Sequence, residues 1–176
     1  MAIRIYDTFD GTKKEFQPIR KGSVGMYMCG MTVQDKPHMG HMMAFVAGDM
    51  IRRYLEYRGY EVTYVQNFTD VDDKIIARAK AEGVDYRTIA ERYTLEYFKY
   101  ADMLNVRRAT VHPKATDHIR EIIDLVNQLI SKGLAYPSGG DVYFEVAKFP
   151  NYGKLSKKNI DELRAGARIE IGEHKR

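Results

Sequence analysis

The chain has 176 residues, enough for one full hydrophobic core, and its 44% hydrophobic and 30% charged residues are ordinary for a globular protein. No apolar run approaches the roughly 18 residues of a membrane-spanning helix, and Arg4 and Asp7 exclude a secretory signal at the N-terminus. A single cysteine excludes an internal disulfide framework and is typical of the cytoplasm, while a net charge of +4 permits a nucleic-acid partner without demanding one.

The first third of the chain predicts two hairpin strands, then a strand, a helix and a strand. Apolar residues on both sides of Asp10-Gly11 predict the hairpin, because this dipeptide favours a tight turn. The compact apolar segment 24–29 is typical of a buried parallel strand, and residues 61–67 predict a second one. Between them the pattern is helical from residue 44 and ends at Gly59. The expected core face of this helix consists of Ala44, Ala47, Ile51, Tyr54 and Leu55.

Strand, helix and strand in this order imply a right-handed crossover and a doubly wound parallel sheet. In such sheets, ligands bind beyond the carboxyl ends of the strands. These ends are Cys29-Gly30 and residues 67–70, so we expect the two polar segments to converge on one site.

Two capping boxes predict the next two helices. Thr69 with Asp72 opens a helix over residues 72–82, and Thr88 with Glu91 opens a second one. The second helix is expected to direct four residues into the core: Ile89, Tyr93, Tyr97 and Ala101.

The last third of the chain predicts one amphipathic helix and one strand. The helix begins at residue 116 or 117, after a loop, and ends at Gly133. Its apolar stripe consists of Ile119, Ile122, Ile123, Val126 and Ile130. Residues 142–146 predict a strand, and beyond Pro150 we identify no core element.

The most informative segment is 29–41, which connects the first buried strand to the long helix. A helix N-terminus has unpaired N–H groups and a partial positive charge, so anions bind there. Gly40 lacks a Cβ where a ligand would approach, and His38 and His41, one turn apart, can face the same ligand. The segment therefore predicts a phosphate site.

Two motifs and five shorter segments follow one another along the chain. The motifs are Cys29-Gly-x-Thr-Val-x-Asp-x-x-His38-Met-Gly-His41 and Asn67-Phe-Thr-Asp-Val-Asp-Asp-Lys-Ile-Ile76. The segments are Ala115-Thr116-x-His-Ile119, Lys132-Gly-x-Ala-Tyr136, Asp141-Val-Tyr-Phe144, Tyr152-Gly-x-Leu-Ser156 and Ala165-Gly-Ala-Arg168. Together they resemble the class I aminoacyl-tRNA synthetases, and specifically the cysteinyl-tRNA synthetases. The first motif departs from the family pattern at Gln34, Lys36-Pro37, Met39 and Met42-Met43.

The resemblance implies an α/β fold, a Rossmann-like (HUP-type) doubly wound parallel sheet that is incomplete here, with the start of a connective insertion. Residues 1–112 would form the N-terminal half of the catalytic domain, and 113–176 would end that half and begin the insertion. The family is much longer, so its Lys-Met-Ser-Lys-Ser loop, its other zinc ligands and its anticodon-binding region are expected beyond Arg176. Lys154-Leu-Ser-Lys157 superficially resembles that loop, but its neighbours place it in the insertion.

The resemblance also implies a cysteine–tRNA ligase, which activates cysteine with ATP and transfers the cysteinyl group to tRNA(Cys). His38 and His41 would be catalytic, stabilising the charge that develops on the α-phosphate. ATP, with Mg²⁺, would be bound by Thr32, His38, Gly40 and His41, and cysteine by Gly30, Thr32 and Thr69. A membrane partner is not expected. The chain would act in the cytoplasm as a monomer, or complemented by the missing C-terminal part.

Cys29 has two interpretations. A lone cysteine at a strand end is typical of a small buried hydrophobic residue, whereas the resemblance implies a thiolate ligand to a Zn²⁺ that binds the thiolate of substrate cysteine. A soft thiol coordinates zinc and the hydroxyl of serine does not, so such a site discriminates between the two amino acids. Zinc takes about four ligands, and we find no three others here, so the zinc site is expected to be incomplete. The histidines considered are His38, His41, His112, His118 and His174.

Two other functions stay open: the cysteine-adenylating ligase of mycothiol biosynthesis, which resembles this family, and a truncated, non-catalytic paralogue that binds nucleotide or tRNA. A dinucleotide-binding fold is disfavoured because no G-x-G-x-x-G follows the first buried strand. Two roles stay open for the residues at the start of the next helix, namely helix capping and contact with a ligand. These residues are Asp72, Asp73 and Lys74. Arg107-Arg108 and residues 154–158 stay unassigned between tRNA contact and a solvated face.

Overall fold

The computed structural model describes residues 2–157, which belong to two compact units. One unit is Pro18–Ile119, and the other contains residues 2–17 and 120–157. The sequence expectations for residues 158, 165–168 and 174 lie outside the described residues.

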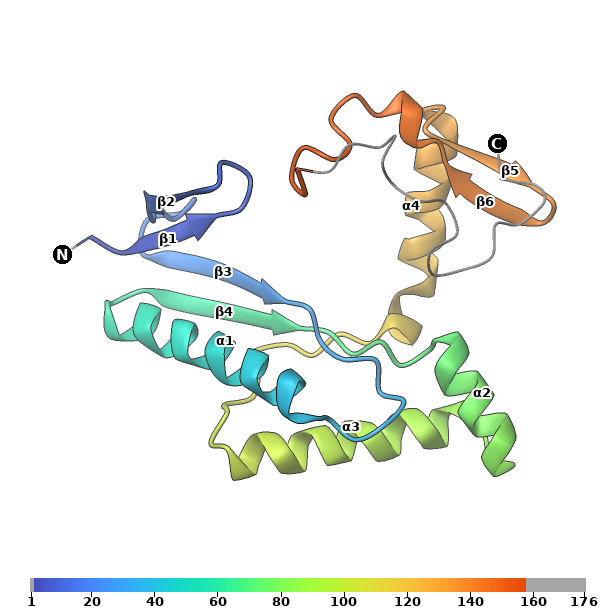
Figure 1. Cartoon of the computed structure of the whole chain (residues 1–176), viewed down its shortest axis with the longest axis horizontal. Helices are drawn as coiled ribbons and strands as arrows, with labels where there is room; N and C mark the ends of the chain where they lie inside the picture. Colours follow the sequence, from blue (N-terminus) through green and yellow to red (C-terminus); the bar gives the residue numbers. More distant parts are fainter. Residues whose placement is uncertain (1, 158–176) are drawn as a thin grey trace. The chain divides into compact units, whose positions relative to one another are not determined.

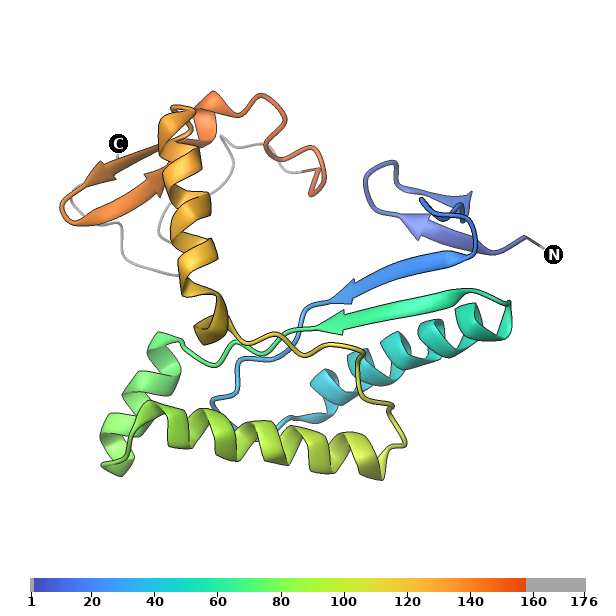
Figure 2. The same ribbon diagram turned by 180° about the vertical axis from the view of Figure 1, so that it is seen from behind.

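The unit Pro18–Ile119 is built on two parallel strands, β3 (Ser23–Met28) and β4 (Glu61–Gln66), connected by α1 (Met39–Tyr57). The strands pair without a shift, from Ser23 opposite Glu61 to Met28 opposite Gln66. Figures 1 and 2 show α1 and α3 on the same side of this ribbon. The predicted strand–helix–strand order is confirmed.

A third extended segment lies along the other edge of β4. Val111 forms a parallel bridge with Val65, and Lys114 forms one with Phe68. The N–H of Phe68 donates to the carbonyl of Pro113 at 2.9 Å. The sequence predicted only a loop here. A proline cannot donate to a ladder, but this proline contributes its carbonyl as an acceptor.

Two helices follow β4: α2 (Asp73–Glu82) and α3 (Tyr86–Met103). The predicted capping boxes at Thr69 and Thr88 are wrong. The N-caps are Asp72 and Asp85, whose carboxylates accept the N–H groups of Lys74 and Arg87. Aspartate is a strong N-cap, and the backbone of Thr69 is already bound in a bridge to Thr32.

The core of this unit lies between α1, α3 and the sheet. The four core residues predicted for α3, namely Ile89, Tyr93, Tyr97 and Ala101, are all buried. Tyr97 meets the rings of Phe45 and Phe68 edge-on, with centroids 5.2 Å away in both cases. Its hydroxyl donates to Oε1 of Gln66 at 2.5 Å. Burial raises the pKa of Tyr97 to about 12, so the phenol keeps the proton that it donates.

The predicted core face of α1 is wrong except at Leu55. Ala44, Ala47, Ile51 and Tyr54 are exposed. The buried residues are Met42, Phe45, Gly48, Asp49 and Leu55. Gly48 decides this orientation, because a Cβ there would lie 2.6 Å from Sδ of Met28 and 2.8 Å from the hydroxyl of Tyr64.

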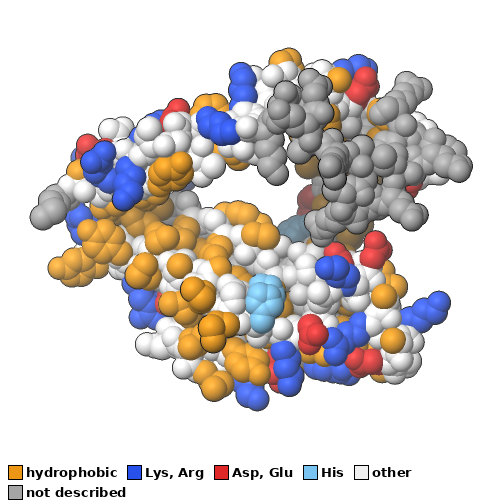
Figure 3. Space-filling model, viewed as in Figure 1, with side chains coloured by type: hydrophobic (Ala, Val, Ile, Leu, Met, Phe, Trp, Pro, Cys, Tyr) orange, Lys and Arg blue, Asp and Glu red, His pale blue; other side chains and the backbone are white. Residues whose placement is uncertain are grey.

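A broad apolar stripe therefore stays on the surface. Figure 3 shows hydrophobic side chains gathered over α1. The large exposed ones on this helix are Met39, Met43, Val46, Met50, Ile51, Tyr54 and Tyr57.

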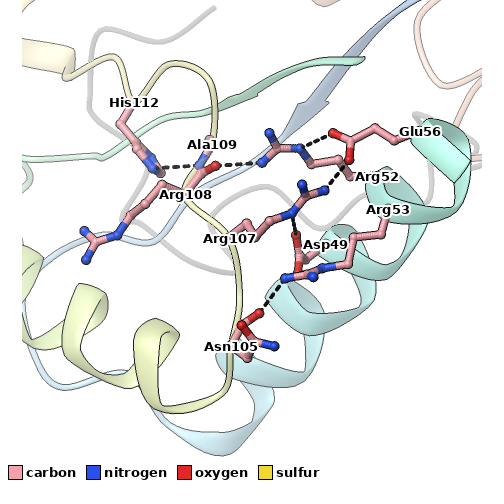
Figure 4. Close-up of polar contacts among 9 residues, drawn as sticks. All are labelled: Asp49, Arg52, Arg53, Glu56, Asn105, Arg107, Arg108, Ala109 and His112. Carbon is pink, nitrogen blue, oxygen red and sulfur yellow. Dashed lines mark hydrogen bonds and ion pairs between the residues drawn. The ribbon is translucent and has the colours of Figure 1, made fainter. Parts of the chain in front are cut away.

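Two arginines of α1 bind the loop that follows α3 (Figure 4). Arg52 donates to the carbonyl of Arg108 at 2.6 Å, and Arg53 donates to the carbonyl of Asn105 at 2.7 Å. Asn105 has a φ of +55°, a left-handed conformation that asparagine tolerates better than most residues. These bonds join the C-terminal half of α1 to the segment that leads into residues 111–114.

Ion pairs reinforce the same junction. The carboxylate of Asp49 is almost fully buried and accepts from Arg53 at 2.7 Å, and Arg107 lies 3.8 Å from its other oxygen. Glu56 pairs with Arg52 at 3.0 Å and also with Arg107. The two arginines hold the pKa of the Glu56 carboxyl below its usual range, chiefly through the Arg107 hydrogen bond. We call the six residues Asp49, Arg52, Arg53, Glu56, Arg107 and Arg108 the α1 clamp.

The other unit contains two small antiparallel hairpins and one helix. The first hairpin, β1 (Arg4–Asp7) and β2 (Thr12–Glu15), turns through Gly11 as predicted. The second, β5 (Ala135–Ser138) and β6 (Asp141–Phe144), contains one strand that was not predicted, since Pro137 disfavours a strand. A 3₁₀ turn over Ala115–His118 leads into α4 (Ile119–Ser131), and Val146–Lys148 forms a second 3₁₀ turn. No residue of α4 is buried, so its predicted apolar stripe is unburied.

Candidate functional site

The segments that follow β3 and β4 meet, as their positions at the strand ends predicted. Thr32 and Thr69 form a parallel bridge. The N–H of Val33 donates to the carbonyl of Thr69 at 3.3 Å, and the N–H of Thr69 donates to the carbonyl of Met31 at 3.2 Å. The pairing of the two strands thus continues beyond their regular ends and places Thr32 beside Thr69.

Gly30 is packed directly against the other segment. Its N–H donates to Oδ1 of Asn67 at 2.9 Å. A Cβ on Gly30 would lie only 1.5 Å from the carbonyl oxygen of Asn67, so only glycine fits here without displacing the backbone. This close approach brings Cys29-Gly30 to the Thr32–Thr69 pair.

Asn67 has a positioning role that the sequence reasoning did not assign. Its Oδ1 also accepts the hydroxyl of Tyr27 at 2.9 Å, and its amide nitrogen donates to Oγ1 of Thr69 at 3.5 Å. Asn67 therefore contacts both predicted cysteine-binding segments. The available signal was a polar residue at the carboxyl end of a buried parallel strand.

His38 and His41 lie together at the N-terminus of α1. His38 is the N-cap, and its side chain accepts the N–H of His41. The imidazole of His41 accepts the N–H of His38 in return. The two rings are stacked with centroids 3.6 Å apart and planes 20° apart. Burial, and then the nearby His38, lower the pKa of His41, which favours the neutral form of this ring.

Gly40 makes room for a ring of the protein itself. A Cβ on Gly40 would lie 3.1 Å from Cε1 and 3.2 Å from Nδ1 of His38. The expectation from the sequence was space for a ligand at this position. The first neighbour that a side chain at residue 40 would meet is the capping imidazole.

Cys29 is exposed, so it is not a buried hydrophobic residue. Across residues 2–157, no three histidine, cysteine, aspartate or glutamate side chains are grouped so that they would hold a metal ion. His112 is occupied in the interior, where Nδ1 bonds the carbonyl of Gln66 at 2.9 Å and Nε2 accepts the N–H of Ala109 at 3.2 Å. The described residues therefore do not by themselves form a zinc site at Cys29.

The acidic residues after Thr69 have structural partners. Asp70 is buried and accepts both the N–H and the hydroxyl of Thr116, at 3.0 and 2.5 Å. Asp72 caps α2, and Asp73 lies in the first turn of that helix. Arg107 belongs to the α1 clamp, and Arg108 pairs with Asp102 at 2.7 Å.

The similarity of the chain to known proteins extends over its whole length. A family model described as "tRNA synthetases class I (C) catalytic domain" matches residues 15–176. The cysteine–tRNA ligase of Geobacter metallireducens is 56% identical over 176 residues, which are 100% of this chain and 36% of that protein. The cysteine–tRNA ligase of Desulforudis audaxviator is 55% identical over 174 residues, 99% of this chain and 36% of that protein.

A solved structure of Mycobacterium tuberculosis methionyl-tRNA synthetase in complex with methionyl-adenylate has a similar fold. The TM-score is 0.58 at 23% identity, over 65% of this chain and 24% of that one. This likeness confirms the predicted fold, an incomplete Rossmann-like α/β sheet. The chain spans 36% of the length of the two curated relatives, and their similarity confirms the motif-based prediction. The chain belongs to the family of class I (C) tRNA synthetase catalytic domains, of which it is an N-terminal portion.

Proposed function

We propose that this chain is the N-terminal part of a cysteine–tRNA ligase. The observation that carries the proposal is the 52–56% identity, over nearly the whole chain, to relatives of that name. The longer enzyme would join cysteine to ATP, release pyrophosphate, and transfer the cysteinyl group to tRNA(Cys). The geometry supports this, because Cys29-Gly30, the Thr32–Thr69 pair and the N-terminus of α1 all follow the carboxyl ends of the two parallel strands.

The activation step places negative charge at the N-terminus of α1. A carboxylate oxygen of cysteine attacks the α-phosphorus of ATP, an acyl-phosphate bond forms, and the bond to pyrophosphate breaks. The attacking carboxylate is already ionised, so no general base is needed. His38, His41 and the helix N-terminus donate hydrogen bonds to the developing charge. Thr32 and Gly40 complete the proposed ATP contacts, and Mg²⁺ enters with ATP as part of the substrate.

Cysteine would bind against Gly30, Thr32 and Thr69, with its thiol toward Cys29. A zinc ion held by Cys29 would supply selectivity for a thiol over a hydroxyl. Because residues 2–157 contain no group of three side chains that could hold a metal ion, the proposed mechanism includes no step at the metal.

Binding of a stable cysteinyl-adenylate analogue to the 176-residue chain tests this function. We expect His41→Ala to weaken binding about tenfold or more, because a hydrogen bond to a charged group is lost. His118→Ala replaces an exposed histidine of the 3₁₀ turn and is the matched control, with affinity expected near that of the unaltered chain. Equal affinity of all three proteins would contradict the proposed site.

Catalysis is tested separately. Cysteine-dependent exchange between ATP and pyrophosphate measures adenylate formation, and cysteinylation of tRNA(Cys) by the full-length protein separates a tRNA ligase from a mycothiol-pathway ligase. Exchange by the 176 residues alone would eliminate a non-catalytic module. Cysteinylation of an amino sugar instead of tRNA would contradict the proposal.

Three further points stay predictions. They are the division of the catalytic half from the insertion at residue 112, action in the cytoplasm, and a monomeric or complemented state. Within residues 2–157, no helix combines the length and the hydrophobicity that a membrane crossing requires.

A further inference from the structure

The N-terminus of α1 is capped by two imidazoles that bind each other's backbone. The N–H of His41 donates to Nδ1 of His38, and the N–H of His38 donates to Nδ1 of His41, each at 3.4 Å. This is the geometry of a capping box, in which a serine or threonine and a glutamate normally take these two positions. The first turn of α1 contains no acidic residue that would replace them.

The hydrogen bonds indicate where the ring protons lie. A ring nitrogen that accepts an N–H must have a free lone pair, so neither Nδ1 is protonated. A neutral imidazole then has its proton on Nε2. Two charged rings stacked at 3.6 Å would also repel each other and the positive end of the helix.

We propose that the reciprocal cap locks His38 and His41 as neutral Nε2–H tautomers, so that each Nδ1 positions α1 and each Nε2–H faces an anionic ligand. In each imidazole, Nδ1 thus caps the helix and Nε2–H is the donor to the ligand. The capping part stands on the geometry alone, and the ligand part rests on the proposed ATP site. The phosphate would be held by two neutral donors and the helix dipole, without imidazolium charge.

Gly40 supports this division of tasks. The position of its absent Cβ is 3.2 Å from Nδ1 and 3.1 Å from Cε1 of His38. A side chain at residue 40 would press on the capping edge of the imidazole. Glycine therefore leaves this edge of the ring free to accept the N–H of His41.

The most direct test uses the unaltered chain. Long-range ¹H–¹⁵N spectra of the imidazole rings distinguish a protonated ring nitrogen from an unprotonated one. We expect an unprotonated Nδ1 and a protonated Nε2 for both His38 and His41 near pH 8. A proton on Nδ1 of either ring, or the tautomer mixture of a free histidine, would overturn the proposal.

Two substitutions at His38 separate the cap from the donor. The amide oxygen of asparagine in His38→Asn lies near the position of Nδ1 and is a strong N-cap, but nothing replaces Nε2–H. The longer amide of His38→Gln carries an N–H donor near the position of Nε2 and caps the helix poorly. Because His38 is exposed, both variants are expected to fold.

We expect opposite orders for stability and affinity. His38→Asn should keep the urea midpoint of the unaltered chain, and His38→Gln should lower it. For Mg–ATP or inorganic pyrophosphate, His38→Asn should weaken binding about tenfold or more, and His38→Gln should stay within about threefold of the unaltered chain. Equal stability of the two variants would overturn the capping role, and the reverse order of affinity would overturn the donor role.

The outcomes also separate this proposal from the proposed function. If the tautomers and the stability order are as expected but neither ATP nor pyrophosphate binds, the ATP site fails and the cap stands. If ATP binds but Nδ1 of either ring carries the proton, the proposed capping role is refuted and the proposed ATP site is retained.

Discussion

Replacement of Gly30 by alanine is expected to disrupt the junction between the two strand ends. The new methyl carbon would lie 1.5 Å from the carbonyl oxygen of Asn67 and 2.7 Å from its carbonyl carbon. Real Cβ atoms essentially never approach closer than 3.0 Å, so the two backbones must separate by a large part of that difference. The obstacle is backbone, which cannot rotate away as the end of a flexible side chain does.

The magnitude follows from two costs. Overpacking of a well-packed site destabilises proteins by about 1–3 kcal/mol, and loss of the bond from the Gly30 N–H to Asn67 adds about 1 kcal/mol. We therefore expect Gly30→Ala to lower the free energy of unfolding by about 2–4 kcal/mol. For a chain of this size, that corresponds to a melting temperature lower by about 4–16 °C.

Gly25→Ala is the matched control. Gly25 also lies in β3, and a Cβ there would meet nothing within 4 Å. Alanine in a strand is expected to leave stability unchanged or raise it by up to about 1 kcal/mol. Urea denaturation followed by circular dichroism measures all three proteins. A Gly30→Ala variant within about 0.5 kcal/mol of Gly25→Ala would refute the reasoning, since that is the scatter of ordinary surface substitutions.

Three other predictions concern the core, the α1 clamp and pH. Tyr97→Phe removes the hydroxyl that binds Gln66 and should lower the free energy of unfolding, measured in urea, by about 1–3 kcal/mol, because a buried acceptor is left unsatisfied. Asp49→Ala should lower the free energy of unfolding by about 1–2 kcal/mol, because the α1 clamp loses its buried carboxylate. This value is smaller than for a fully buried ion pair, since the paired Arg53 is partly exposed to water. An unchanged melting curve would contradict a stabilising role of Asp49. Burial lowers the pKa of His112, so its contribution to stability is complete above the ordinary pKa of about 6.5 and is lost as the pH falls below that value. The urea midpoint should therefore be lower at pH 5.5 than at pH 7.5, and His112→Gln should reduce this difference.

Patterns within single segments predicted the strand–helix–strand unit correctly. The apolar composition of β3 and β4 indicated parallel strands correctly, because composition is a property of each segment. The predicted burial is wrong for β3, where only Val24 is buried, whereas every second residue of β4 is buried. The meeting of Cys29-Gly30 with residues 67–70 followed from a general rule for such sheets. Both predictions needed no knowledge of which side chains touch.

The errors arose where contacts between distant segments decide the outcome. The burial of α1 is set by the close approach of Gly48 to Met28 and Tyr64, whereas the apolar stripe indicated a different face. The role of Asn67 depends on hydrogen bonds to Tyr27 and Gly30, about 40 residues earlier in the chain. Periodicity and spacing contain no information on such pairs.

The α1 clamp holds the C-terminal half of α1, and the histidine pair lies at the other end of the same helix. About 16 Å of helix, at 1.5 Å per residue, separates His41 from Arg52. A tilt of about 4° about the clamped end would move the histidines by about 1 Å, an error that can reduce catalytic rates about a hundredfold. The position of the proposed phosphate-binding end therefore depends on the opposite end of the helix, where Arg52 and Arg53 bind the carbonyls of Arg108 and Asn105.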